Sequence, residues 1–226
     1  MTTMKPDIKH HVPDDLLMAY SAGALPEAYS LAIATHLSLC DTCRAAAESY
    51  DAVGGAVLED APEGAATMSM DSLAQTLARL KASEPREAVR PARPRSIFPG
   101  PLADYVGTSL DDIRWRPIGM GAKQMVIRTS PTASARLLYI PSGVGVPDHT
   151  HGGKELTVIL DGAYSDETGR YGPGDIAYGD DELHHAPIAE DGGPCICLAV
   201  TDAPLRFKTI IPRENGFGNN REGDDR

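Results

Sequence analysis

The sequence predicts an α+β protein in which a small N-terminal helical bundle precedes an antiparallel β-sandwich or small barrel. Three observations predict this class. Apolar residues recur at helical spacing through the first 82 residues, whereas short β-branched runs separated by glycine and proline dominate after residue 100. A proline- and arginine-rich stretch separates these two regions. The length of 226 residues leaves room for two small domains.

Two successive apolar stripes indicate the first helices. They consist of Leu16, Leu17 and Tyr20 before Gly23, and of Leu31, Ile33, Ala34 and Leu37 after it. So small a helical unit cannot bury all of these side chains internally. We therefore expect Leu16, Leu17 and Tyr20 to belong to a surface that a protein partner covers.

Two further helices are expected before residue 83. The third should begin after Asp41 and run toward Val57, and the adjacent glycines at 54 and 55 should weaken its end. The fourth should span about residues 70–82, where Leu73, Leu77 and Leu80 recur at helical spacing. The apolar face of this fourth helix also needs a partner. These helices define an N-terminal domain at residues 1–82.

The remainder of the chain divides into three segments. Residues 83–100 are rich in proline and arginine, which favours an extended interdomain linker that keeps the two domains mechanically independent. Residues 101–213 contain β-branched runs at 124–128, 135–140, 156–160 and 195–200, which predict the antiparallel β domain. Residues 214–226 contain Phe217 as their one apolar residue, so we expect a disordered tail.

Charge and cysteine content exclude several functional classes. The formal net charge is −11, and acidic residues outnumber basic ones by 11 to 5 over residues 1–82 and by 19 to 12 over residues 101–226. Such surfaces repel phosphate backbones, so direct binding of nucleic acid is not expected. No apolar run is long enough for a membrane span, and the four cysteines lie in two tight pairs. We expect a cytoplasmic protein with reduced thiols.

The first metal-ligand pattern lies between the second and third expected helices. His36, Cys40 and Cys43 form an HxxxCxxC sequence, which brings one imidazole and two thiolates to one point. Zinc favours four nitrogen and sulfur ligands in a tetrahedron, so a fourth ligand is required. His10 and His11, just before the first helix, are the candidates, and we choose His11 while His10 stays open.

This pattern resembles that of the zinc-binding anti-sigma family over about residues 5–82. The resemblance is carried by His11, His36, Cys40 and Cys43 in a short, acidic, helical domain. It implies that this domain binds an extracytoplasmic-function (group IV) sigma factor and prevents its use by RNA polymerase. It also implies that the zinc ion is structural, because a closed four-ligand site has no open position for a substrate.

A second metal-ligand pattern lies in the β domain. His149 and His151 are two residues apart and therefore share one face of a strand, and Glu155 follows after a glycine bend. Together with Gly143 and Gly162 they form the first motif of the cupin family. The sequence therefore predicts that the β domain is a cupin β-sandwich or barrel.

The second cupin motif is degenerate in this sequence. Its turn is present as Pro173-Gly174-Asp175, but the next histidine comes late, at His184 or His185, and the usual asparagine is missing. We choose His185, which directly precedes Ala186-Pro187. Three imidazoles and one carboxylate suit zinc, iron, manganese or nickel, so the identity of this metal stays open.

The combination of both patterns resembles the ChrR-type zinc-binding anti-sigma factors over nearly the whole chain. The resemblance implies zinc as the cofactor, with two ions per chain. It also implies that the cupin domain senses oxidative stress, singlet oxygen or organic peroxide, and that the sigma factor is then released. Cys195 and Cys197 alternate along an apolar strand, so we expect them to pack in the core rather than to bind metal.

The alternative function is a metal-dependent cupin enzyme, a dioxygenase or an isomerase, with the helices as an accessory domain. Such an enzyme needs an open metal coordination position and a substrate pocket, and the sequence gives no convincing sign of either. A third possibility is an adaptor that only binds zinc. We therefore expect a regulator and not an enzyme.

Overall fold

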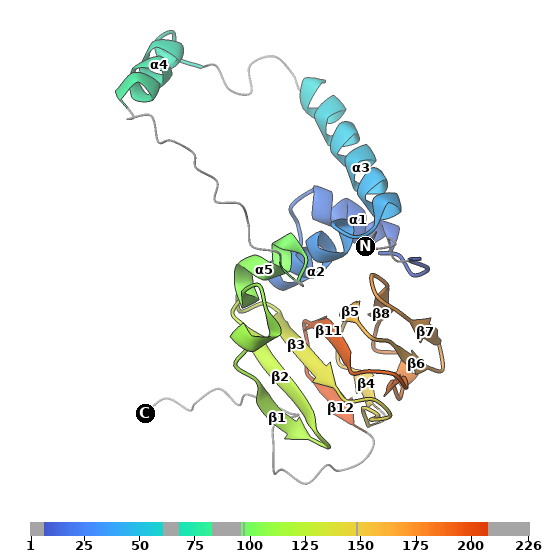
Figure 1. Ribbon diagram of the computed structural model, residues 1–226. Coiled ribbons are helices and arrows are strands. Elements are labelled where there is room, and N and C mark those ends of the chain that lie inside the picture. Colours follow the sequence, from blue (N-terminus) through green and yellow to red (C-terminus); the bar gives the residue numbers. More distant parts are fainter. Residues whose placement is uncertain (1–6, 61–67, 83–95, 97, 148, 208–226) are drawn as a thin grey trace, which may run out of the picture.

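The computed structural model describes residues 7–60, 68–82, 96, 98–147 and 149–207. The helices at 14–21, 27–37 and 100–106 and the start of the helix at 41–59 lie at one end of a β-sandwich, as Figure 1 shows. This arrangement confirms the predicted α+β class. Most of the expected linker at 83–100 and all of the expected tail at 214–226 lie outside the described residues.

The first three helices follow the predicted order, with α1 at Asp14–Ser21, α2 at Glu27–Leu37 and α3 at Asp41–Glu59. Proline precedes both α1 and α2, where its fixed φ angle suits a helix start. Gly23 adopts a φ of 65° just beyond α1, a left-handed conformation that ends a helix at little steric cost. Cys40 caps α3, because its sulfur accepts a hydrogen bond from the backbone N–H of Cys43.

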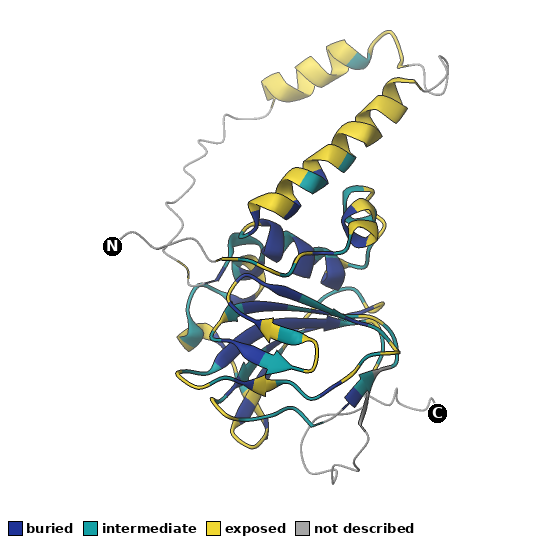
Figure 2. Cartoon of the chain, turned by 90° about the vertical axis from the view of Figure 1, so that its right-hand side faces the viewer, coloured by how far each residue is buried: buried dark blue, intermediate teal, exposed yellow. Residues whose placement is uncertain are grey.

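Helix α3 continues through the glycines at 54 and 55, so the expected weakening of its end is not observed. Helix α4, at Ser72–Ala82, matches the fourth predicted helix and contains no buried residue. Figure 2 shows that α4 and the distal part of α3 are exposed, in contrast to α2. These two segments therefore expose apolar side chains to solvent.

The β half consists of antiparallel strands in three sheets. The six-stranded sheet has the order β1-β2-β3-β11-β5-β8, and the two small sheets have the orders β10-β6-β7 and β12-β4-β9. The bounds in chain order are β1 Arg116–Gly119, β2 Ala122–Ile127, β3 Ser134–Ile140, β4 His149–His151, β5 Glu155–Asp161, β6 Tyr164–Asp166, β7 Gly169–Tyr171, β8 Ile176–Gly179, β9 His184–His185, β10 Ile188–Ala189, β11 Cys195–Thr201 and β12 Leu205–Phe207. Before them lie the short helix α5, Gly100–Val106, and a 3₁₀ turn at Leu110–Asp112.

Strand β11, inside the six-stranded sheet, is buried on both faces. Ile196, Leu198 and Val200 belong to the core that the sheet shares with the helices, where α2 packs against β11 and β5. Cys195 and Cys197 alternate with them and face a second core inside the sandwich. This explains the continuous apolar run in the sequence, because side chains of a strand point alternately to its two faces.

Helices α1, α2 and α5 and the start of α3 share one core with the sheet, so the expected mechanical independence of this part of the chain from the β half is not observed. Leu16 and Leu17 are only 5% and 1% exposed and lie in the same core as the sheet residues. The expectation that they form a partner surface is therefore wrong, because α1 packs against α3 and α2, and α2 in turn packs against the sheet. Tyr20 packs against the same core. None of the helices in the described part of the chain is long and apolar enough to cross a membrane.

Candidate metal centres

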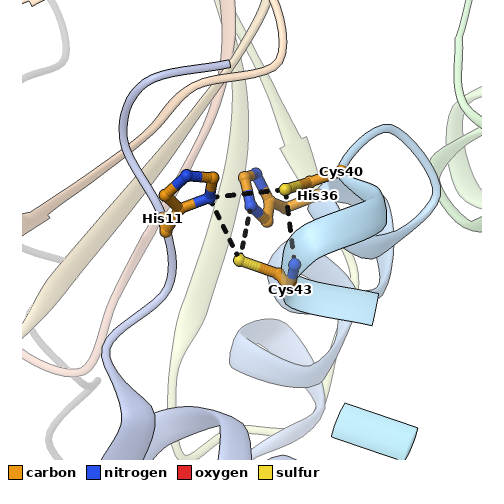
Figure 3. A group of neighbouring side chains, drawn as sticks. All are labelled: His11, His36, Cys40 and Cys43. Atoms are coloured by element: carbon orange, nitrogen blue, oxygen red, sulfur yellow. Dashed lines mark hydrogen bonds between the residues drawn. The ribbon is translucent and has the colours of Figure 1, made fainter. Parts of the chain in front are cut away.

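The first cluster contains the four residues that the sequence predicted, as Figure 3 shows. His11 lies just before α1, His36 lies in the last turn of α2, and Cys40 and Cys43 lie at the start of α3. One ligand atom of each lies within 4.8 Å of all the others. The short α2–α3 connection therefore brings the His36 imidazole and the two cysteine sulfurs to one point, as the HxxxCxxC spacing predicted.

The His36 ring has one tautomer that fits its surroundings. Its Nδ1 lies 2.8 Å from the carbonyl oxygen of Gly174, which can only accept, so Nδ1–H donates. The Nε2 lone pair then faces the Cys43 sulfur, 3.3 Å away. Burial lowers the pKa of His36 to about 4, so the ring is neutral at physiological pH and able to bind a metal ion.

The two thiols complete a tetrahedral donor set. The His11 Nδ1 atom lies 3.4 Å from both cysteine sulfurs, and the edges of a zinc tetrahedron between nitrogen and sulfur are about 3.5 Å. Burial raises the pKa of the Cys43 thiol to about 11, so a thiolate at this position requires a cation beside it. Two nitrogens and two sulfurs fit zinc.

The geometry favours His11 over His10 as the fourth member of this cluster. The His10 ring packs against Tyr171 with 4.2 Å between centroids, and its Nε2 lies 3.1 Å from the carbonyl oxygen of Arg170. It is therefore engaged by the β half and not by the cysteines.

The second cluster joins His149 on β4, Glu155 at the start of β5 and His185 on β9. His149 and His185 are opposite each other in the antiparallel β4–β9 pair. One ligand atom of each of the three residues lies within 4.8 Å of the others. The choice of His185 over His184 agrees with this geometry, because His184 lies on the exposed face of β9.

The hydrogen bonds of the two rings point both Nε2 lone pairs at one place. His149 Nδ1 donates to the carbonyl oxygen of Pro147 at 2.8 Å, and His185 Nδ1 donates to Asp166 at 2.7 Å. In the neutral rings both Nε2 atoms are then acceptors, yet they lie 3.1 Å apart. A metal ion between two such acceptors and a carboxylate resolves this mutual repulsion.

Asp166 is a residue that the sequence analysis missed. Burial acts to raise the pKa of its carboxyl, but hydrogen bonds from Thr168 and His185 outweigh this effect, so the pKa lies below its usual value. The side chain is 1% exposed and orients the His185 ring. No sequence signal marks it, because β6 and β9 come together only in the folded chain.

The other predicted residues are placed as follows. The side chain of His151 lies outside the described residues, although its backbone pairs with Leu205 of β12. Cys195 and Cys197 are buried and do not form a disulfide bond. A hydrogen bond with Cys195, together with burial, holds the pKa of the Cys197 thiol well above its ordinary value. Both cysteines therefore behave as core residues.

Comparison with known proteins gives two extensive matches. A family model described as the ChrR cupin-like domain matches residues 104–203. The anti-sigma-E factor ChrR of Cereibacter sphaeroides is 55% identical over 207 residues, which cover 91% of this chain and 95% of that protein.

A solved structure shows the same likeness. The crystal structure of Rhodobacter sphaeroides SigE in complex with the anti-sigma ChrR matches with a TM-score of 0.73 and 51% identity, covering 86% of this chain and 99% of that chain. KdgF from Halomonas sp. matches with 17% identity and a TM-score of 0.38, covering 42% of this chain and 90% of that one. The second value is too low to establish a shared overall fold.

Proposed function

The chain belongs to the ChrR family of anti-sigma factors, and from this premise we propose that it sequesters a group IV sigma factor in the cytoplasm and releases it under oxidative stress. The anti-sigma role is supported by the identity to ChrR along most of the chain and by the likeness to a chain crystallised with SigE. We therefore assign the chain a regulatory role.

The observation that carries the proposal is the exposed apolar face of α4. Leu73, Leu77 and Leu80 are 70%, 46% and 64% exposed. A single helix of 11 residues is marginal in water unless its apolar face packs against something. A sigma factor that covers this face would stabilise the helix and gain the hydrophobic contact.

The distal part of α3 carries a second set of exposed apolar side chains. Val53, Val57 and Leu58 are 63%, 68% and 77% exposed, and they follow the last buried residue of α3, Ala47. Groups of large exposed apolar side chains on a helix are typical of a protein interface. We name Val53, Val57, Leu58, Leu73, Leu77 and Leu80 the docking surface.

Zinc is the metal we assign to both clusters, with two ions per chain. The Cys₂His₂ set of the first cluster favours zinc by ligand type, and an ion there fixes the ends of α2 and α3. The His149, Glu155 and His185 set suits zinc as well, with His151 as a fourth ligand. The second ion would lie in the half of the protein that we assign to sensing singlet oxygen or organic peroxide.

The test is an in vitro transcription assay with RNA polymerase and Rhodobacter sphaeroides SigE, the partner of a 51% identical relative. The full zinc-loaded chain should inhibit SigE-dependent transcription when about one equivalent of the chain is added per SigE. A variant that lacks residues 68–82 should inhibit far less and keep both zinc ions. Equal inhibition by the two proteins would contradict the assignment of α4.

A further inference from the structure

A cavity of about 200 Å³ lies inside the sandwich beside the second cluster. Its walls are mostly apolar and include Ile118, Met120, Leu138, Val144 and Val146. One end is formed by His149, Glu155 and His185. Among the described residues that line it, Glu155 is the one acidic group, and no lysine or arginine is present.

The volume of the cavity limits the size of a bound ligand, and the charge at its metal site favours an anionic group on that ligand. An apolar cavity of about 150 Å³ holds a benzene molecule, so this one accommodates an apolar body of about six to ten non-hydrogen atoms. A divalent ion with one carboxylate ligand and neutral imidazoles carries a charge of about +1 within its own ligand set. The Asp166 carboxylate lies on the Nδ1 side of the His185 ring and does not line the cavity, so the ion is the nearest charge to a ligand there and favours a monoanion. Met120 is 66% exposed, so the cavity reaches the surface at the β1–β2 turn.

We propose that this cavity binds a small monocarboxylate with an apolar body, with the carboxylate beside the metal site, where charge attraction holds it without displacing a protein ligand, and the body against Leu138, Val144 and Val146. The proposal rests on the second metal ion of the proposed function. It would make the cupin half a receptor for a small molecule in addition to its proposed role in stress sensing.

The experiment is calorimetric titration of the full zinc-loaded chain with octanoate. Octanoate should bind at least tenfold more tightly than acetate, which lacks the body, and than 1-octanol, which lacks the charge. Val146→Phe and Val144→Phe should each abolish octanoate binding at unchanged zinc content. Val126→Phe is the matched control, because Val126 is 51% exposed on β2 and does not line the cavity.

Two outcomes would overturn the proposal, and zinc counting separates them. If two zinc ions are bound and octanoate binds no better than acetate, the ligand proposal fails and the proposed function stands. If the second cluster holds no ion, both the ligand proposal and the two-zinc assignment fail. Octanoate binding that survives both valine substitutions in folded protein would also refute the cavity as its site.

A different set of contacts carries a second inference, about the first cluster. Asp175, 3% exposed at the turn before β8, accepts hydrogen bonds from the backbone N–H groups of Lys9 and His10 at 2.7 and 2.9 Å. Its other oxygen accepts from the N–H of Gly172 at 2.9 Å. Ile176 N–H donates to the carbonyl oxygen of His10 at 3.3 Å. The segment that leads into His11 is therefore held by the β half.

We infer that Asp175 is a positioning residue for the first metal ion, supplied by the cupin half. Without its carboxylate, two backbone N–H groups lose their acceptor and the segment before His11 is released. The neighbouring Gly174 carbonyl orients the His36 ring from the same turn. Such outer contacts typically change metal affinity 10- to 100-fold.

The test measures Co²⁺ binding to the full chain. Of the two clusters, only the first contains cysteines, so the absorption band between thiolate and cobalt reports binding at that cluster alone. Asp175→Ala should weaken Co²⁺ binding at the first cluster at least tenfold, and Asp175→Asn, which keeps one carbonyl acceptor, should weaken it less. Asp112→Ala is the matched control, because Asp112 accepts two successive N–H groups at 3.0 Å within the β half. Folded Asp175→Ala that binds Co²⁺ as tightly as the wild type would overturn the inference.

Discussion

Replacing Leu73, Leu77 and Leu80 together by alanine should separate partner binding from folding. The three side chains are on average 60% exposed, from individual values of 70%, 46% and 64%. Leu→Ala removes about 2.4 kcal/mol of transfer free energy at full burial, so covering the exposed part is worth about 1.4 kcal/mol per residue. The sum of about 4 kcal/mol corresponds to roughly 1000-fold weaker binding of the sigma factor.

The same substitutions should leave the free protein almost unchanged. Because α4 contains no buried residue, the free energy of unfolding should change by less than about 0.5 kcal/mol, and alanine favours the helix. The assay is calorimetric binding to Rhodobacter sphaeroides SigE, together with thermal unfolding. The control is Val126→Ala, an exposed apolar side chain on β2 far from α4 in the sequence. If the triple variant binds SigE as tightly as the wild type, the reasoning about α4 is wrong.

Three further outcomes are expected. Cys43→Ala should reduce the zinc content from two ions to one and leave a sigma-dependent reporter active without stress; a variant that retains two ions and represses normally would contradict the first site. Asp166→Ala should weaken metal binding at the second cluster 10- to 100-fold, because the His185 ring loses its acceptor, whereas Asp161→Ala at the end of β5 should not. His149→Ala should keep repression but prevent release by an oxidative stimulus, and normal release in that variant would show that the second metal has no part in signalling.

The sequence predicts the first cluster well because its geometry is mostly local. His36, Cys40 and Cys43 lie within eight residues, and the turn between two helices brings them together whatever the rest of the chain does. The second cluster is predicted through a family motif at His149 and Glu155. Its His185 was a choice between neighbours that depends on strand direction, which the sequence leaves open.

Contacts between the two halves could not be predicted. Helical periodicity identifies Leu16 and Leu17 as an apolar stripe, but it does not say whether a partner or the protein's own sheet covers that stripe. The sequence identifies Asp175 only as part of a turn, and no pattern in the sequence identifies Asp166 as a partner of His185. Both act on groups more than 15 residues away, across pairings that exist only in the folded chain.

The most direct test of the central claim is to mix the zinc-loaded chain with SigE and measure complex formation, zinc content and SigE-dependent transcription on one sample. We predict a one-to-one complex with two zinc ions per chain, loss of transcription at about one equivalent, and protection of the docking surface on α3 and α4 from hydrogen exchange. Transcription that continues at full rate in the presence of excess folded, zinc-loaded chain would contradict the account.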